Sequence, residues 1–530
     1  MNTPAEIRPL SPLMPLAASI LFAVALTQPP VFYSNQNQYF LHGLASSGFA
    51  DLSSDWLANT KDSTPVFSWA VSVLYPLTGA MGVYAGFFVM SMVYFLSLWA
   101  IIATLPGKPV TTAGRWTFAA AMIGLHSGII RWGSVYLFGV DYPWFFQAGV
   151  ANQYILGAGL QPSVFGVFLL TAIAFFAHGR NVAAGMMIAL ACTLHSTYLL
   201  PGALLVTGMM VRLAVSQGIG KAIRFGLIVL LGVLPVTVAA AVVFRPTDSA
   251  TFEEGQRILA WVRIPHHCDA ARWIDLIAWL QIAWAGLGIV ALWRSNLTLA
   301  IGIAVSLATG LSIVQILTHN TSLALLFPWR LSAVIVPVAT AVLLARLTAG
   351  LEKLPGVFIG LCSFVVIAVA VVGAERVHSK NLGYQVSAAE DGLQLFVNAN
   401  RQPGDVYLLP AGFPKPPAKP GSASASFVPV SQTGRPAMFE LQRFRLIAGA
   451  AAYVDFKSIP YADIEVIEWQ NRVKTVVRWY ATPDWDSSGV LDEVRVAGIT
   501  HVVVPDGVNV ASSHLKQVYG DPAYRVFRIE

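Results

Sequence analysis

Apolar segments alternate with short polar segments through the first 374 residues of this 530-residue chain. A helix needs about 20 apolar residues to cross a bilayer, and most of these segments approach that length. They predict membrane spans near residues 10–33, 81–105, 116–130, 162–177, 225–244, 273–293, 297–317, 330–346 and 355–374. Together with a broken segment described below, they indicate a polytopic α-helical membrane protein with about 10 to 11 membrane helices.

Residues 64–80 are apolar, but they are flanked by proline and are short for a full crossing. If this segment crossed the membrane, Lys108 and Arg115 would lie on the outer side, against the charge pattern described below. We therefore expect a helix that lies on the outer membrane surface, with Trp69 and Tyr75 in the headgroup region.

Residues 181–211 form a second unusual apolar segment, with arginines at both ends. One crossing would place one basic end outside, and two full crossings would need about 40 residues. Two short helices that meet near residues 195–198, with a break at the Pro-Gly pair 201–202, satisfy both constraints. Broken backbone at membrane depth must line protein or a water-filled cavity. We therefore expect His195 near the floor of an outward-open cavity.

The polar connections are sorted by charge. One set carries the basic residues Arg8, Lys108, Arg115, Arg180, Arg212, Lys221, Arg224, Arg294, Arg346 and Lys353, with only Glu6 and Glu352 as acids. The other set carries Asp51, Asp55, Asp62, Asp141, Asp248, Glu253, Glu254, Asp269 and Asp275, and nearly every histidine of the membrane part. The positive-inside rule predicts that the first set is cytoplasmic, so the reactive side chains face outward.

The composition changes from Glu375 onward, where charges, prolines and glycines rise and no long apolar run remains. We expect strands at 404–410, 499–505 and 524–529 and an amphipathic helix at 464–480. This pattern predicts a soluble, extracytoplasmic α/β domain over residues 375–530.

The predicted domain organisation is therefore a transmembrane domain over residues 1–374 and the α/β domain after it. The outer loops of the membrane domain are expected at residues 34–80, 131–161, 245–272 and 318–329. The first span also has features of a cleavable signal peptide, but we expect a retained helix, because the later spans keep their charge bias only if the chain starts inside.

The composition excludes an ordinary soluble protein: 56% of the residues are apolar, 11% are charged, and the mean hydropathy is +0.63. The net charge of +6 would suit nucleic acid, but much of the basic excess lies in the short turns, so we expect no nucleic-acid partner. Three cysteines give no disulfide framework. No Walker-type loop or GxGxxG motif is present, which argues against ATP-driven work.

Asp51 and Asp55 in the first outer loop are the leading candidates for a catalytic carboxylate. If residues 51–56 are helical, the two side chains share a face, and two close carboxylates raise the pKa of one of them, as a general base requires. The alternative is a solvated loop in which these acids only cap a helix.

The second outer loop offers Asp141 among aromatic residues, followed by Gln161. An acid among aromatic rings can bind the face and hydroxyls of a sugar, and carboxylate and amide oxygens can hold a divalent metal ion. The alternative is an interfacial aromatic belt with Ser163 capping the next helix. A divalent metal ion is therefore a possible cofactor.

The third outer loop brings arginines and histidines together at Arg245, Arg263, His266 and His267, and Arg330 lies at the outer end of a later span. Guanidinium groups match phosphate oxygens in pairs, so this loop would suit a lipid-linked phosphate. The two histidines point to opposite sides if the chain is extended, so we expect only one to serve a metal ion. The alternative is a hydrophilic loop with snorkelling arginines, Arg330 being an interfacial anchor.

Lys457 interrupts an apolar segment that we expect to be a strand of the outer domain. It could reach toward a phosphate or an acidic sugar at the membrane surface, or serve the structure alone.

Several of these features resemble the GT-C type of integral-membrane glycosyltransferase and uncharacterised bacterial membrane proteins related to it. They are the carboxylate at Asp51 or Asp55, the interfacial helix after it, the acid at Asp141 and the outer C-terminal α/β domain. The first loop lacks an adjacent pair of acids, so both aspartates stay candidates for the base.

The resemblance implies transfer of a sugar from a polyprenyl phosphate-linked donor to a glycan, lipid or protein acceptor on the extracytoplasmic face of a bacterial inner membrane. An outer-loop aspartate would act as general base, and His195 and the basic residues would neutralise the departing phosphate. Such a role belongs to cell-envelope polysaccharide biosynthesis. The competing hypotheses are a transporter or flippase for lipid-linked glycans and a glycan ligase or polymerase.

Overall fold

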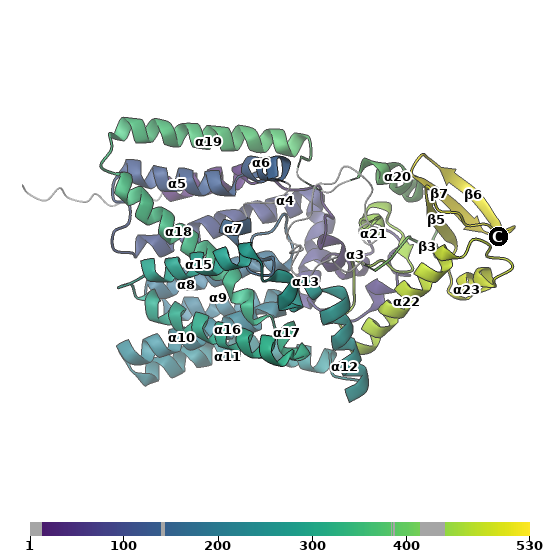
Figure 1. The fold of residues 1–530 in the computed structure, drawn as a ribbon, viewed down its shortest axis with the longest axis horizontal. Coiled ribbons are helices and arrows are strands. Elements are labelled where there is room, and N and C mark those ends of the chain that lie inside the picture. The colour runs from purple at the N-terminus through teal and green to yellow at the C-terminus, as the bar shows by residue number, and fades with distance from the viewer. Residues whose placement is uncertain (1–12, 139–143, 383, 385–386, 414–439) are drawn as a thin grey trace, which may run out of the picture.

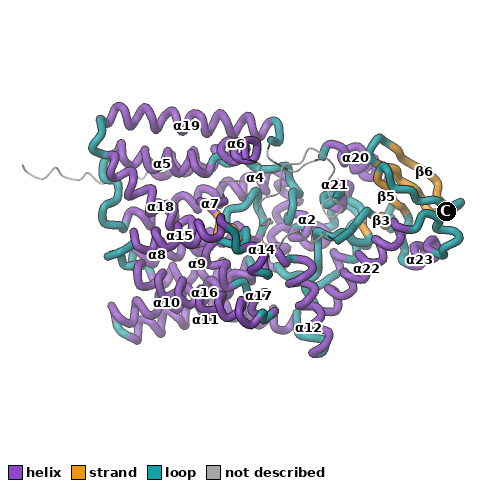
Figure 2. Tube along the Cα trace, in the orientation of Figure 1, coloured by secondary structure: helices purple, strands orange, loops and turns teal. Residues whose placement is uncertain are grey.

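The computed structural model describes residues 13–138, 144–382, 384, 387–413 and 440–530. Figure 1 shows a bundle of long helices that lie roughly side by side, with a smaller domain at one end of the bundle that contains the sheet. Figure 2 shows that helix dominates the bundle and that strands are concentrated in the C-terminal part. The fold is therefore a helical membrane domain followed by a C-terminal α/β domain, as the sequence predicts.

Six helices in the described part of the chain are long and apolar enough to cross a membrane, by length and composition. They span Pro65–Ala103, Ser196–Gln217, Ile219–Val243, Leu297–Thr318, Thr321–Leu351 and Gly356–Ser379. Four shorter apolar helices span Leu13–Ala25, Pro162–Ala177, Asn181–Leu194 and Leu276–Ala291. These helices confirm a multi-pass membrane protein.

The helices of the bundle follow the predicted spans closely. They are α1 (Leu13–Ala25), α4 (Pro65–Ala103), α5 (Thr112–His126), α6 (Gly128–Phe138), α8 (Val167–Ala177), α9 (Asn181–Leu194), α10 (Leu199–Gln217), α11 (Ile219–Val243), α15 (Leu276–Ala291), α16 (Leu297–Thr318), α18 (Ser332–Leu351) and α19 (Gly356–Ser379). Large apolar side chains such as Leu231 on α11 and Val357 on α19 are exposed, as expected of helices that face lipid.

Short elements lie in the connections between these helices. They are α2 (Gln36–Tyr39), α3 (Leu41–Ser46), η1 (Leu57–Asn59), α7 (Trp144–Gln147), β1 (Ala148–Gly149), β2 (Gln153–Tyr154), η2 (Pro162–Gly166), η3 (Ser196–Tyr198), α12 (Ser249–Arg257), η4 (Ile258–Arg263), α13 (Pro265–Cys268), α14 (Ala270–Trp273), α17 (Thr321–Leu325) and η5 (Pro328–Leu331).

Gly79 divides α4 into two helices. Its φ of 55° and ψ of −148° lie outside the helical region and are open to glycine, which has no side chain. In the segment before Gly79, Phe67 and Val71 are buried while Trp69 and Leu77 are exposed. This two-faced pattern agrees with the predicted surface helix, which is therefore separate from the span that follows.

The apolar segment 181–211 is broken, as predicted, and the break lies at His195. That residue has extended backbone between α9 and η3, and α10 begins at Leu199. The Pro-Gly pair 201–202 lies within the first turn of α10 and does not interrupt it, because proline is tolerated where its missing N–H has no partner within the helix. The predicted break at this pair was therefore wrong by a few residues.

The predicted span 116–130 also differs in its boundaries. It begins at Thr112, where the Thr111 side chain caps the helix by accepting from Gly114 N, and it ends at His126. Ser127 has extended backbone, and α6 follows as a separate helix.

The C-terminal domain contains a five-stranded mixed sheet with the strand order β4-β3-β5-β7-β6. Its elements are η6 (Ala388–Glu390), α20 (Asp391–Asn400), β3 (Val406–Leu408), α21 (Phe444–Ala448), β4 (Ala451–Ala452), α22 (Asp463–Ala481), α23 (Val490–Val496), β5 (His501–Pro505), β6 (Leu515–Gly520) and β7 (Tyr524–Ile529). The three predicted strands and the predicted helix are therefore present. A buried core that includes Val473, Trp479 and Val502 packs α22 near the sheet.

The two sets of connections lie at opposite ends of the bundle. At the end away from the C-terminal domain, Arg346 donates to the carbonyl of Pro106, and Glu352 accepts from Thr111 N. The acidic connections instead contact the C-terminal domain, through Lys61 N to Glu465, Thr247 N to Asp463 and Gln38 to the carbonyl of Ile459. The predicted sorting of charge thus corresponds to two spatially separate ends.

Gly208 lies where α10 contacts α16, and a Cβ there would meet the carbonyl oxygen of Ala300. We expect Gly208→Ala to lower the free energy of unfolding by about 1 to 3 kcal/mol, because overpacking forces the two helices apart. Gly310→Ala on α16 is the matched control, since a Cβ there meets nothing within 4 Å. Thermal unfolding of both full-length variants in one detergent measures the difference, and equal melting temperatures would contradict it.

Candidate functional site

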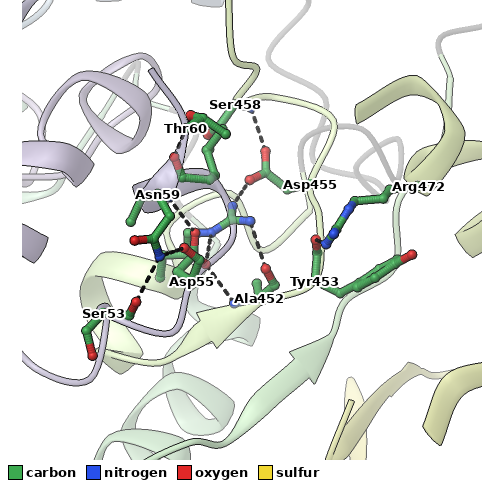
Figure 3. A network of polar contacts seen from close by, with 12 residues as sticks. Ser53, Asp55, Asn59, Thr60, Ala452, Tyr453, Asp455, Ser458 and Arg472 are labelled. Carbon is green, nitrogen blue, oxygen red and sulfur yellow. Dashed lines mark hydrogen bonds and ion pairs between the residues drawn. The ribbon is translucent and has the colours of Figure 1, made fainter. Parts of the chain in front are cut away.

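A buried ion-pair network attaches the first outer loop to the C-terminal domain (Figure 3). Asp55 is fully buried, and its Oδ2 accepts from Arg445 Nε at 2.6 Å and from Ala452 N at 2.9 Å. Its Oδ1 accepts from Ala58 N at 3.1 Å. Arg445 also donates to Asp455, which lies beyond β4. One guanidinium group therefore neutralises two buried carboxylates from distant parts of the sequence.

This geometry does not favour the predicted role of Asp55 as general base. Both oxygens of its carboxylate accept hydrogen bonds, and the guanidinium group of Arg445 is paired with it at 2.6 Å. The proposed helix over residues 51–56, which would have paired Asp51 with Asp55, does not form. Asp55 is better described as an anchor between the loop and the domain.

Asp51 binds a different point of the same domain. Its Oδ2 accepts from Gly404 N at 2.7 Å, and its backbone forms a bridge with Ala450. Asp51 is half-buried, and its carboxylate therefore also fixes the loop to the domain. The third predicted acid, Asp141, lies outside the described residues.

Arg472 strengthens the same contact from α22. Its guanidinium lies 4.3 Å from the ring centroid of Trp56 in the first loop and 4.6 Å from that of Tyr453 (Figure 3 labels Arg472 and Tyr453). A cation between two aromatic faces is attracted to both. Arg472 also forms an ion pair with Glu468 at 2.8 Å on the same helix, but this pair accounts for only part of the role of Arg472.

Most of the predicted basic residues lie together where the membrane domain meets the C-terminal domain. Arg330 is only 9% exposed, and its guanidinium lies 5.2 Å from the ring centroid of Tyr198 and 5.9 Å from that of Phe327. His195 lies at the helix break. Its ring centroid is 5.6 Å from that of Tyr198 and 5.7 Å from that of Tyr39. The broken helix and the arginine of η5, just before α18, therefore meet.

Arg263 lies at the end of η4, a short π-helical segment. It is 8% exposed, lies 5.3 Å from the ring centroid of Phe456, and donates to the carbonyl of Lys457. The charges of Arg263 and Arg330 both act on the hydroxyl of Tyr39, so the two side chains belong to one group of neighbouring residues. Burial raises the pKa of Tyr39 well above its ordinary value, so its hydroxyl stays protonated.

Lys457 belongs to a bend after β4 and not to a strand, which corrects the prediction for that segment. Burial and the positive charge of Arg263 together lower the pKa of its ammonium group to about 7, although Asp455 partly opposes this shift. Lys457 therefore brings a titratable side chain of the C-terminal domain close to Arg263.

His266 and His267 lie on the short helix α13, and their ring centroids are 4.1 Å apart. The expectation that they point to opposite sides was wrong, because the segment is helical and not extended. His267 Nδ1 donates to the carbonyl of Ala151 at 2.7 Å. Burial lowers the pKa of His267 to about 3 and that of His266 well below its ordinary value, so both rings are neutral near pH 7.

The two remaining predicted residues, Gln161 and Arg245, lie in different places. Gln161 is buried and bonds with Tyr154, whose hydroxyl is acted on by Arg330, so Gln161 lies at the edge of the cluster. Arg245 is exposed after α11, and no contact within the described residues joins it to the others. Sequence reasoning missed Tyr39 and also Tyr461, whose hydroxyl bonds with that of Tyr39 and accepts from Gln38 at 2.9 Å. Their only signal was their position in segments expected to lie outside.

Several polar atoms around the cluster are buried and have no hydrogen-bond partner within the described part of the chain. They are Ser163 Oγ, His195 Nδ1, Thr197 Oγ1, Arg263 Nε, Trp273 Nε1, Trp329 Nε1 and Arg330 Nε. A buried donor or acceptor without a partner costs about 1 to 3 kcal/mol. Such atoms gathered beside buried cations are typical of a site that a polar, anionic ligand completes. We call the set Arg263, Arg330, Lys457, His195, His266 and His267 the basic cluster.

No three His, Cys, Asp or Glu side chains within the described ranges lie close enough to hold a metal ion. The positive charges of Arg263 and Arg330 in the basic cluster favour an anion such as phosphate.

Comparisons with known proteins add the following. The family described as a domain of unknown function (DUF6798) matches residues 435–476, and the family described as a protein of unknown function (DUF1097) matches residues 258–390. No curated protein matches the sequence. Among solved structures, the chain is similar to the crystal structure of ArnT from Cupriavidus metallidurans bound to undecaprenyl phosphate, at 14% identity and a TM-score of 0.42 over 97% of each chain.

Removing Arg445 would leave Asp55 and Asp455 buried without their counter-charge. We expect Arg445→Met to lower the free energy of unfolding by about 3 to 5 kcal/mol, as found when one partner of a buried ion pair is removed. Arg257→Met is the control, because Arg257 forms an exposed pair with Glu254 that contributes about 1 kcal/mol or less. Thermal unfolding and limited proteolysis of the C-terminal domain measure both variants, and equal stability of the two would contradict the role of the network.

Proposed function

We propose that the protein is a membrane glycosyltransferase that moves a sugar from a polyprenyl phosphate-linked donor to an acceptor on the extracytoplasmic face. The observation that supports this function best is the basic cluster. Two arginines that are nine-tenths buried, Arg263 and Arg330, have side-chain N–H groups without partners at the outer end of a helical bundle. A lipid-linked phosphate supplies the acceptor oxygens and the negative charge that these groups lack, and the membrane holds its apolar chain.

In the proposed reaction, the acceptor hydroxyl oxygen forms a bond to the sugar carbon while the bond from that carbon to the phosphate oxygen breaks. The phosphate leaves with the electron pair, and Arg263, Arg330 and Lys457 stabilise the charge that develops on it. His266 and His267 are neutral and orient the phosphate as hydrogen-bonding groups. The proton of the acceptor passes to an outer-loop carboxylate.

We propose that this carboxylate is not Asp55, because both of its oxygens accept hydrogen bonds that hold the first loop to the C-terminal domain. We assign the role to Asp141 or Asp51, the other two acids of the predicted set. Replacing each residue in turn by asparagine distinguishes the two assignments. Only the loss of the true base would abolish transfer without lowering the amount of folded protein.

Transport of a lipid-linked glycan is the second candidate function. The broken pair α9 and α10, with His195 at the break, favours it, because broken helices form the substrate sites of many transporters. Ligation of preassembled glycans would use the same chemistry as transfer with a larger donor.

Release of polyprenyl phosphate from a radiolabelled lipid-linked sugar by the purified protein distinguishes these functions. We expect Arg330→Gln and Arg263→Gln each to reduce this release by roughly 10- to 100-fold, because each removes charge-assisted hydrogen bonds to the phosphate. Arg257→Gln, on the exposed face of α12, is the control and should retain full activity. Movement of intact donor across vesicles without its cleavage would refute transfer and favour transport.

The lowered pKa of Lys457 predicts that the affinity for the donor depends on pH. Its ammonium group attracts phosphate only while protonated, so the affinity for the donor should fall as the pH rises above about 7. The phosphodiester of the donor keeps its charge over this range, and the histidines stay neutral. The fall is at most tenfold per pH unit for one titrating group.

Donor binding measured from pH 6 to 9 tests this pH dependence. Lys457→Arg, which stays charged, should remove most of the dependence. An unchanged profile in that variant would exclude Lys457.

A further inference from the structure

We propose that a pocket between the end of α4 and the start of α5 binds the headgroup of an anionic phospholipid. Trp99 on α4, Lys108 in the following turn, and Arg115 and Phe118 on α5 line this pocket. It lies at the end of the bundle away from the C-terminal domain, so it is separate from the basic cluster and does not rest on the function proposed for it.

The two cations of the pocket keep most of their hydrogen-bonding capacity. Lys108 donates to the carbonyl of Ala103, and Arg115 Nε donates to the carbonyl of Pro109 at 3.3 Å. No ion pair joins either side chain to an acid within the described ranges, although both are half-buried. An ammonium group has three N–H donors and a guanidinium group has five, so both terminal nitrogens of Arg115 remain available to phosphate oxygens.

The acidic residue that contacts this turn, Glu352, already accepts several hydrogen bonds. Glu352 Oε1 accepts from Val110 N, Thr111 N and Thr111 Oγ1, each at 2.8 Å. It therefore satisfies the backbone at the start of α5. A third cation, Arg346, donates to the carbonyl of Pro106 and adds positive charge beside the same turn. The local charge around the pocket is thus positive, which an anion would balance.

Aromatic rings give the pocket an apolar wall. Trp99 stacks on Phe95 with ring centroids 5.9 Å apart, and its ring lies 5.7 Å from that of Phe118. Tryptophan beside lysine and arginine at a membrane surface is typical of contact with the headgroup and glycerol region of lipids. Basic pockets between membrane helices on the cytoplasmic side bind anionic headgroups. A phospholipid fits both walls, whereas a free phosphate uses only the cations.

Lipid titration of the full-length protein in neutral detergent, followed by native mass spectrometry, tests this site. The probes are phosphatidylglycerol, phosphatidylcholine and soluble glycerol phosphate. We expect preferential binding of phosphatidylglycerol, and a loss of about tenfold or more in its affinity for Lys108→Gln/Arg115→Gln, since each cation near a membrane surface contributes to the attraction. Arg180→Gln/Lys353→Gln removes the same charge from exposed positions at the same end and should retain the affinity.

Equal losses in the two double variants would overturn the site, because they would indicate attraction by the whole basic surface. Equal affinity for the two phospholipids would also overturn it. Binding of glycerol phosphate as tight as that of phosphatidylglycerol would identify a phosphate site without a lipid requirement and refute the proposal. Lys108→Arg/Arg115→Lys keeps the charge and should keep the binding, which separates a lost site from a misfolded protein.

Discussion

The ion pairs of Arg445 with Asp55 and Asp455 hold the two parts of this protein in one arrangement. Buried charges are expensive unless they are paired and hydrogen-bonded, and Asp55 is fully buried, with hydrogen bonds to both carboxylate oxygens. The same network continues through Asp455 to the amide of Ser458, at 2.6 Å. The bend that carries Lys457 therefore depends on a contact made with the first outer loop.

The basic cluster is assembled from both parts, and neither part contains it alone. Arg330 and His195 come from the membrane domain, Arg263 from a loop element, and Lys457 from the C-terminal domain. Burial and the nearby charge of Arg263 both lower the pKa of Lys457, so gathering these cations costs free energy. The ion pairs of Arg445 help to offset this cost.

The sequence predicted much of this fold because hydrophobic pattern and charge sorting act locally. The spans, the helix break at His195 and three strands follow from residues close together in the chain. The role of Asp55 could not be predicted, because its partner Arg445 is 390 residues away and nothing near Asp55 indicates an ion pair. The side-by-side histidines were missed for a different reason: Pro265 begins a single helical turn where extended chain was expected.

The membrane domain uses arginine and lysine in two distinct ways. At the end away from the C-terminal domain they are half-buried or exposed, and Lys108 and Arg346 donate to nearby carbonyls. In the basic cluster, by contrast, Arg330 is nine-tenths buried and its Nε has no partner within the described residues. Orienting a helix requires only a charge that stays hydrated, so burial of a guanidinium group without an acid beside it needs another cause. The phosphate of the donor that we propose supplies that cause, and burial, more than the number of cations, therefore distinguishes the proposed site.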